Sequence, residues 1–381
     1  MFDFADLNHT ELQKIFLSVS LPFFNKKKNW NSTSFAKFLS LPYFFILPMD
    51  PLDFRSDTVT KPSLNMRKAM FEAQVGDDVY QDDQTVNHLQ TYAAKKFGHS
   101  AALFFPTGTQ AGLCALLSHC QRGEEYIAGH LAHHYKYEGG GASVLGGIQA
   151  QPIEQLENGE MPLEKIRAAI KPADIHFAIT RLICLENTFW GRVLSWEYML
   201  AVKTMAKEFH LQFHLDGARI FNAAVEMGCD VKKITELFDS ACICLSKGLG
   251  APAGTLLVGS TEFIEKARRW RKICGGGMRQ VGILAAAAQV ALEDSPKLLL
   301  ADHQKAKFLA EKLNQKPELK AYACTNMVFF SPPLEKMESL NQALVRKNIL
   351  ARISPFTRLV LHLDIPENAI NSVAEVILKE T

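Results

Sequence analysis

Seven short apolar runs that alternate with helical patterns constrain the fold of this chain more than any other feature. Each run has the length of a strand, and the segments between the runs have the spacing of amphipathic helices. Strands that alternate with helices predict an α/β fold in which a mostly parallel seven-stranded sheet carries helices on both faces. The predicted strands are residues 101–105, 126–128, 148–152, 181–186, 212–216, 241–245 and 255–259.

The rhythm changes after an alanine-rich helix predicted over residues 282–292. The chain then alternates helices at 300–313, 334–347 and 365–379 with strands at 327–330 and 357–363, which is typical of a small α+β domain. We therefore predict a large domain over residues 49–296 and a smaller C-terminal α+β domain over residues 297–381. Residues 49–57 are expected to pack with the small domain.

Residues 1–48 differ in composition from the rest, with many phenylalanines and a KKK run at 26–28. Their apolar patch at 39–47 is far shorter than the roughly 20 residues that a spanning helix needs, so a membrane anchor is not expected. Met49 begins MDPLDFRSDTVT, which resembles a natural start. We expect residues 1–48 to be an N-terminal extension, either disordered or created by a misassigned start.

The charges are nearly balanced, with 42 basic and 40 acidic residues and a formal net charge of +2. This balance gives no field that would attract nucleic acid or an anionic membrane, so the expected partner is a small molecule. The eight cysteines lack CxxC spacing, which favours reduced thiols in a cytoplasmic protein without a disulfide framework or a structural metal site.

Three motifs with chemical potential follow predicted strands, where ligands bind in open parallel sheets. PTGTQAG (106–112) suits an anion because small residues expose backbone amides at a helix N-terminus, although an ordinary N-cap at Thr107 or Thr109 also explains it. Asp216 in FHLDGAR can be a metal ligand, a helix cap or an acceptor for a protonated ring nitrogen. Lys247 in ICLSKGLGAPAG (243–254) is either a surface charge or a desolvated nucleophile.

These three motifs together match the needs of pyridoxal 5'-phosphate (PLP). The cofactor requires an anion cradle, a carboxylate that keeps its ring nitrogen protonated, and a lysine that forms a Schiff base. A fourth motif, HLAHHYKYEGGG (130–141), places three histidines after a predicted strand. Such a side chain could stack on a cofactor ring, although a lone histidine is usually structural.

From LDFRSDTVTKPS (52–63) to the C-terminus, the chain resembles the low-specificity L-threonine aldolases, which are PLP enzymes of fold type I. The matching segments also include GDDVYQDD (76–83), FPTGTQA (105–111), HLDGARIFNA (214–223) and RWRKICGGGMRQ (269–280). The resemblance implies an aldehyde-lyase that cleaves L-threonine and L-allo-threonine to glycine and acetaldehyde. It also implies a homotetramer whose active sites lie at dimer interfaces.

The resemblance also assigns roles to single residues. Lys247 is implied as the Schiff-base lysine, Asp216 as the partner of the ring nitrogen and His133 as the histidine that stacks on the ring. His133 is also our candidate for assisting proton transfer. The expected phosphate ligands are Gly108, Thr109 and Ser246, and the expected substrate carboxylate ligands are Ser56, Arg219 and Arg358, of which Arg219 is also expected to touch the cofactor.

One departure from the family concerns LENTFWGRV (185–193), where many members have a histidine in place of Phe189. That histidine lies near the substrate hydroxyl, so its loss bears on the preference between threonine and allo-threonine. Two other functions remain open. The chain could be another PLP-dependent lyase that acts on β-hydroxy or β-substituted amino acids, or a protein that binds the cofactor or an amino acid without turnover.

Overall fold

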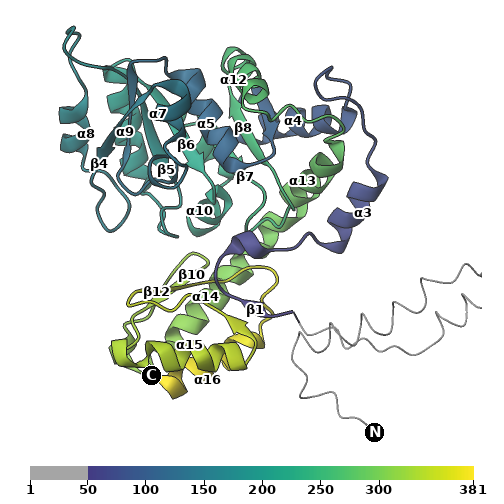
Figure 1. Ribbon diagram of the computed structural model, residues 1–381, viewed down its shortest axis with the longest axis vertical. Helices are drawn as coiled ribbons and strands as arrows, with labels where there is room; N and C mark the ends of the chain where they lie inside the picture. The colour runs from purple at the N-terminus through teal and green to yellow at the C-terminus, as the bar shows by residue number, and fades with distance from the viewer. Residues whose placement is uncertain (1–49) are drawn as a thin grey trace, which may run out of the picture. The chain divides into compact units, whose positions relative to one another are not determined.

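A computed structural model describes residues 50–381 (Figure 1), so the extension predicted for residues 1–48 lies outside the described residues. Its main feature is a seven-stranded sheet in the order β2-β8-β7-β6-β5-β3-β4. All seven predicted strands are confirmed, with ends that agree to within two residues. Their bounds are Ala101–Phe105 (β2), Glu124–Gly129 (β3), Gln149–Ile153 (β4), Ile179–Glu186 (β5), Gln212–Gly217 (β6), Ser240–Cys244 (β7) and Thr255–Gly259 (β8).

The sheet is mostly parallel, as predicted, and β8 is its one antiparallel strand, pairing in that sense with both β2 and β7. A parallel connection needs a crossover of a dozen or more residues, usually with a helix. The segment 245–254 between β7 and β8 has no helix. The chain therefore turns back directly, and this return forms the loop that carries Lys247.

Helices cover both faces of the sheet because successive strand side chains point to opposite sides. On one face, Leu103 and Cys242 pack with α5 and α12, and α7 joins this layer beside α5. On the other face, Ile183 and Ile243 share a core with helices α4, α9, α10 and α13. The bounds are Gln84–Phe97 (α4), Gly108–His119 (α5), Gly141–Gly146 (α7), Trp196–Glu208 (α9), Ile220–Glu226 (α10), Thr261–Ile273 (α12) and Gly282–Asp294 (α13).

Shorter helices and caps complete the same region. Ser195 and Ser260 accept backbone N–H groups in the first turns of α9 and α12, which satisfies donors that a helix start leaves free. Helix α4 ends at Gly98, whose φ of 71° suits a residue without a Cβ. The remaining helices here are Leu64–Glu72 (α3), His133–Lys136 (α6), Leu163–Ala169 (α8) and Val231–Thr235 (α11), with the 3-10 turn Asp57–Val59 (η1).

The C-terminal part of the chain has its own antiparallel sheet, in the order β12-β10-β9, and its own hydrophobic core. The N-terminal strand β1 (Leu52–Asp53) pairs in parallel with β11 (Ile349–Leu350), and Phe54 lies in this second core. The division into a large and a small domain near residue 296 stays a prediction. The other elements are Leu299–Leu313 (α14), Tyr322–Cys324 (β9), Met327–Phe330 (β10), Met337–Arg346 (α15), Thr357–Val360 (β12) and Ala369–Glu380 (α16), with 3-10 turns Ser295–Leu298 (η2), Pro317–Leu319 (η3) and Leu334–Lys336 (η4).

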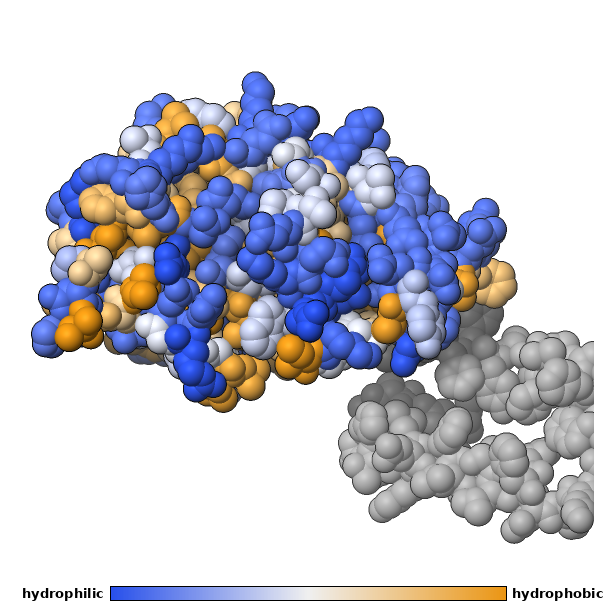
Figure 2. Space-filling view, turned by 90° about the horizontal axis from the view of Figure 1, so that it is seen from above, coloured by the Kyte–Doolittle hydropathy of each residue, from blue (hydrophilic) through white to orange (hydrophobic). Residues whose placement is uncertain are grey.

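The face shown in Figure 2 is mainly hydrophilic, with apolar residues scattered between polar ones. Scattered apolar side chains of this kind are normal on a protein surface. None of the helices within residues 50–381 has the length and hydrophobicity that crossing a membrane would require.

The central strands dominate the stability of the sheet, so truncating one of their buried side chains has a defined cost. Ile243 on β7 is fully buried. We expect Ile243→Ala to lower the free energy of unfolding by about 2–5 kcal/mol, because the change loses buried contacts and leaves a cavity. The matched control is Ile175→Ala, since Ile175 is 98% exposed and should change stability by less than about 0.5 kcal/mol. Urea denaturation followed by circular dichroism measures both, and equal effects would contradict this account of the core.

Candidate active site

The carboxyl ends of β5, β6 and β7 meet at one edge of the sheet because the three strands pair in parallel. A cavity of about 320 Å³ opens at this edge. It is lined by the N-terminus of α5, the start of α6 and the loop after β7. Its walls are Thr58, Gly108, Thr109, Gly112, His133, His134, Glu138, Glu186, His214, Asp216, Ala218, Arg219, Cys242, Cys244, Ser246, Lys247, Pro252 and Thr255.

Helix α5 points its N-terminus into this cavity. Thr107 is the N-cap, and its hydroxyl accepts the backbone N–H of Gln110 at 3.1 Å. The amides of Gly108 and Thr109 precede the first intrahelical bond and remain free to donate to an anion. A Cβ at Gly108 would lie 3.5 Å from the Thr255 hydroxyl, and that buried hydroxyl has no hydrogen-bond partner among the described residues. The N-cap at Thr107 and the free amides of Gly108 and Thr109 therefore occur together at the start of α5, so a helix cap and an anion cradle are compatible explanations of this motif.

Lys247 lies in the loop that returns the chain from β7 to β8. Its carbonyl oxygen accepts the Thr60 hydroxyl at 2.8 Å and the Gly250 amide at 2.8 Å. Gly250 has a φ of 77°, and a Cβ there would lie 2.8 Å from Leu363 Cδ2. Hydrogen bonds from Thr60 and Gly250, and close packing against Leu363, therefore hold the backbone of this loop. The Lys247 side chain lines the cavity, and Lys247 is half-buried at its wall.

Asp216 lies near the end of β6 and lines the same cavity. One carboxylate oxygen accepts the Ala218 amide at 3.0 Å, and the other lies 3.7 Å from Nδ1 of the buried His134. Burial disfavours ionisation of Asp216, but the hydrogen bond and charge of His134, together with the charge of Lys247, outweigh it and hold the pKa of Asp216 well below its usual value. Asp216 therefore presents a carboxylate to the cavity at neutral pH.

His133 is the first residue of α6, and its imidazole is about half exposed. Its Nδ1–H donates to Glu138 Oε1 at 2.7 Å, and its backbone amide donates to Glu186 Oε2 at 2.8 Å. The hydrogen bond to Glu138 raises the pKa of His133 against the opposing effect of burial. Two carboxyl groups thus fix the histidine at the side of the cavity.

Arg219 follows β6 and forms a two-pronged ion pair with the fully buried Asp57, with distances of 2.7 and 2.6 Å. Burial disfavours the charge on Asp57, but Arg219 overcomes it and lowers the pKa of Asp57. Arg358 on β12 makes no side-chain hydrogen bond or ion pair within residues 50–381. Burial lowers its pKa, and the neighbouring charge of Arg219 lowers it further. Ser56 is the N-cap of η1 and accepts the Thr58 amide at 3.2 Å.

The cavity brings together most of the residues expected from the sequence, and two of them lie outside its wall. Ser56 and Arg358 are not lining residues, although Arg358 is close enough to Arg219 for their charges to interact. The residues assembled on the wall are Gly108, Thr109, His133, Asp216, Arg219, Ser246 and Lys247.

Sequence reasoning missed Glu186, Asp57 and the role of His134. Glu186 ends a predicted strand in the same way as Asp216 does, and this position was the available signal. Phe189 is also absent from the cavity wall. Phe189 is buried and stacks on Trp190. A Cβ added at Gly159 would lie 2.7 Å from the Cβ of Phe189. Its effect on the preference between threonine and allo-threonine stays a prediction.

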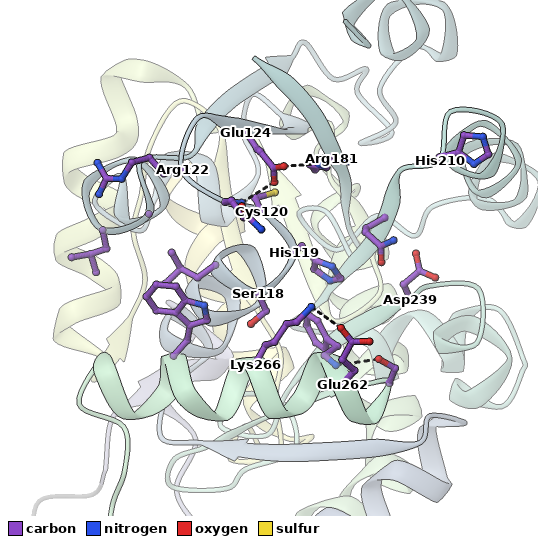
Figure 3. A pocket seen from close by; sticks show the side chains of 18 residues that line it. Ser118, His119, Cys120, Arg122, Glu124, Arg181, His210, Asp239, Glu262 and Lys266 are labelled. Carbon is purple, nitrogen blue, oxygen red and sulfur yellow. Dashed lines mark hydrogen bonds and ion pairs between the residues drawn. The ribbon is translucent and has the colours of Figure 1, made fainter. Parts of the chain in front are cut away.

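A larger cavity, of about 840 Å³, lies at the opposite edge of the sheet (Figure 3). Its charged side chains are largely paired, Glu124 with Arg181 and Lys266 with Glu262. His119 reaches from this cavity to the Ser240 hydroxyl at 2.6 Å, and that hydroxyl lies 2.7 Å from Nδ1 of His214. Burial lowers the pKa of His119 to about 3 and the pKa of His214 well below its usual value. A bridge of uncharged side chains therefore joins the two cavities.

Comparison with known proteins identifies relatives over most of the chain. Residues 53–332 match the beta-eliminating lyase family. The chain is 52% identical over 323 residues to the low specificity L-threonine aldolase of Escherichia coli strain K12, covering 85% of this chain and 97% of that protein. It is 46% identical over 310 residues to low-specificity L-threonine aldolase 1 of Arabidopsis thaliana, covering 79% and 86%. A solved threonine aldolase of Leishmania major shares the fold, with a TM-score of 0.75 at 20% identity over 86% of this chain and 99% of that chain.

The ion pair between Asp57 and Arg219 should make stability depend on pH. Asp57→Asn removes one partner of a buried pair, so we expect a loss of about 3–5 kcal/mol at pH 7. Because the folded-state pKa of Asp57 is lowered, its contribution is present above the unfolded pKa and is lost as pH falls through the folded pKa. The difference between the wild type and the variant should therefore shrink below about pH 4. Urea denaturation at pH 7 and pH 3.5 measures it.

The control for this experiment is Glu208→Gln, which breaks the exposed pair between Glu208 and Arg167. Exposed ion pairs contribute little, so this variant should unfold almost as the wild type does. A constant difference between Asp57→Asn and the wild type at both pH values would contradict the ionised state assigned to Asp57.

Proposed function

Because the chain belongs to the low-specificity L-threonine aldolases of the beta-eliminating lyase family, we propose that it cleaves L-threonine and L-allo-threonine to glycine and acetaldehyde. It is an aldehyde-lyase. The observation that carries the proposal is the convergence of Lys247, Asp216 and the N-terminus of α5 on one cavity. No two of these groups are close in sequence, and a cofactor with an anion, a basic ring nitrogen and an aldehyde needs all three.

The residues present fit PLP. The free amides of Gly108 and Thr109, with the Ser246 and Thr255 hydroxyls, would hold its phosphate at the start of α5. The ionised carboxylate of Asp216 would hold the protonated ring nitrogen, and Nζ of Lys247 would hold the cofactor covalently. His133 would lie against the ring. When bound, PLP supplies an electron sink for the charge left at Cα as the bond to Cβ breaks.

The substrate carboxylate would bind to Arg219 and Arg358, with Ser56 beside them. Two guanidinium groups face the single buried carboxylate of Asp57, so this group of three side chains carries a net charge of +1. Asp57 occupies Nε and Nη2 of Arg219, which leaves Nη1 for another acceptor. An anionic substrate would therefore complete the charge balance, and holding it would orient the bond to be broken.

His133 would assist proton transfer at the substrate hydroxyl, directly or through a water molecule. The carboxylate of Glu138 fixes its Nδ1, so Nε2 is the atom that would accept or donate the proton. Glu138 also raises the pKa of His133, which makes the imidazole a stronger base. The same residue would thus both contact the ring and move the proton.

We extend the proposal to the cellular compartment, the assembly and the metabolic role of the protein. All eight cysteines are free thiols, which suits a cytoplasmic protein. We propose a homotetramer with active sites at dimer interfaces and a role in threonine catabolism and glycine biosynthesis. Nucleic acid and membranes are not among the proposed partners.

The first test is a product assay on the purified protein with PLP. We expect acetaldehyde and glycine from both L-threonine and L-allo-threonine, together with the visible absorbance of bound cofactor. Pyruvate and ammonia in their place would identify another PLP-dependent lyase. Bound cofactor without any product would identify a binding protein, and the absence of both cofactor and aldehyde would refute the proposal.

Substitution of Lys247 tests the covalent link. Lys247→Ala should lower kcat/KM by about 10⁴-fold or more while its circular dichroism spectrum stays that of the wild type. Borohydride reduction of the wild type followed by peptide mapping should find the cofactor on Lys247. The matched control is Lys266→Ala at the opposite edge of the sheet, which should keep both the label and the activity. A label on another lysine would disprove the assignment.

A further inference from the structure

The cavity contains a second carboxyl group beside Asp216. Glu186 ends β5 and Asp216 lies near the end of β6, and the two residues are direct partners in the parallel ladder. Neighbouring strands lie about 4.8 Å apart, and both side chains line the same cavity. Two carboxylates this close repel each other, and this repulsion raises the pKa of one carboxyl group above that of the other.

Asp216 has the partners that an anion needs, namely the Ala218 amide, the buried His134 and the charge of Lys247. His134 is in turn held in its charged form. Burial opposes the charge on this imidazole, but its interactions with Asp216 and Cys184 together outweigh burial and raise the pKa of His134. Asp216 and His134 therefore form an ion pair at neutral pH, and the negative charge of Asp216 has a larger effect on Glu186 than the positive charge of His134.

Glu186 has no ion-pair partner within residues 50–381. Its one hydrogen bond is from the His133 amide to Oε2. Arg219, which also lines the cavity, directs Nε and Nη2 to Asp57, and its Nη1 is the atom proposed above to hold the substrate carboxylate. Burial, followed by the negative charge of Asp216, raises the pKa of Glu186 to about 7. The charged or titratable groups that face it are Asp216, His133, His134, Glu138, Arg219 and Lys247.

These contacts make Glu186 the group in the cavity whose charge can respond to a ligand. A protonated ring nitrogen held by Asp216 adds one positive charge next to the Asp216–His134 pair. Glu186 is the carboxyl group on the cavity wall that has no ion-pair partner within residues 50–381. An opposite charge within about 4–6 Å favours the ionised form of a carboxyl by about 1–3 pH units.

Resting on the proposed function, we infer that Glu186 is the charge-balancing residue of the site, protonated in the cofactor-free protein and ionised when a protonated cofactor ring is bound. The O–H bond of its carboxyl group would break, and the proton would pass to solvent. The ring charge is then matched by a second carboxylate. Glu186 acts through Asp216 and His133 and is a positioning residue, since it keeps the ring nitrogen protonated and holds the His133 amide in both states.

The test is infrared difference spectroscopy with PLP as the probe, at about pH 6, where a group with a pKa near 7 is largely protonated. Loading should remove the carbonyl stretch of one protonated carboxyl group and add a carboxylate band. The titration midpoint of that group should fall by about 1–3 pH units. A carbocyclic analogue of PLP, with CH in place of the ring nitrogen, carries no ring charge and should leave the protonated band in place.

Variants assign the band to a residue. Glu186→Gln keeps an oxygen that accepts the His133 amide and should abolish the band change, whereas Glu197→Gln, at an exposed position on α9, should preserve it. The pH dependence of cofactor absorbance should also change in Glu186→Gln alone. If Glu186→Gln does not fold, isotope-edited spectra of wild-type protein with labelled glutamate carry the same information.

Two outcomes separate this inference from the proposed function. A protein that takes up PLP and cleaves threonine but shows no band change would overturn the inference and leave the function intact. A protein that takes up no PLP would overturn the proposed function. In that case the inference is tested by titrating Glu186 in the cofactor-free protein. A titration midpoint near the ordinary glutamate value of about 4.3 would overturn the inference too.

Discussion

Strands β5, β6 and β7 pair side by side in parallel, so each delivers the residues at its carboxyl end to the same edge of the sheet. Glu186, Asp216 and Lys247 reach one cavity for this reason alone. The return of the chain through β8 without a helix adds the close loop that holds Lys247 in place. The site is therefore a product of backbone hydrogen bonding, and its chemistry depends on strand register as much as on residue identity.

The N-terminal segment is part of this site despite its distance in sequence. Asp57 neutralises Arg219, Thr58 lines the cavity, and the Thr60 hydroxyl bonds to the carbonyl of Lys247. Strand β1, just before them, pairs with β11. The same short segment thus contacts the loop that carries Lys247 and the C-terminal region that carries Arg358. A change in its position would alter both the lysine and the two proposed carboxylate ligands.

Periodicity and spacing predicted the seven strands, their mainly parallel order, and the placement of Asp216 and Lys247 at strand ends. These features are local or follow from strand-helix alternation. Periodicity did not predict the antiparallel direction of β8 or the two-residue strands β1 and β11, because these features depend on contacts between residues that are distant in sequence. Glu186 and His134 were missed for a related reason, since burial and partner charge decide what a carboxyl or an imidazole does. Ser56 and Arg358 came from family resemblance alone.

The bridge from His119 through Ser240 to His214 spans the layer between the two cavities. A serine hydroxyl carries a single hydrogen, so Ser240 can donate to at most one of the two rings, and at least one ring must donate an N–H to Ser240. Both rings are uncharged, and each therefore has one N–H to place. A His119 tautomer that accepts from Ser240 therefore requires His214 to donate its Nδ1–H. In that state Nε2 of His214, a residue on the wall of the cavity that contains Lys247, carries a lone pair, so the position of a proton at one edge of the sheet affects the other edge.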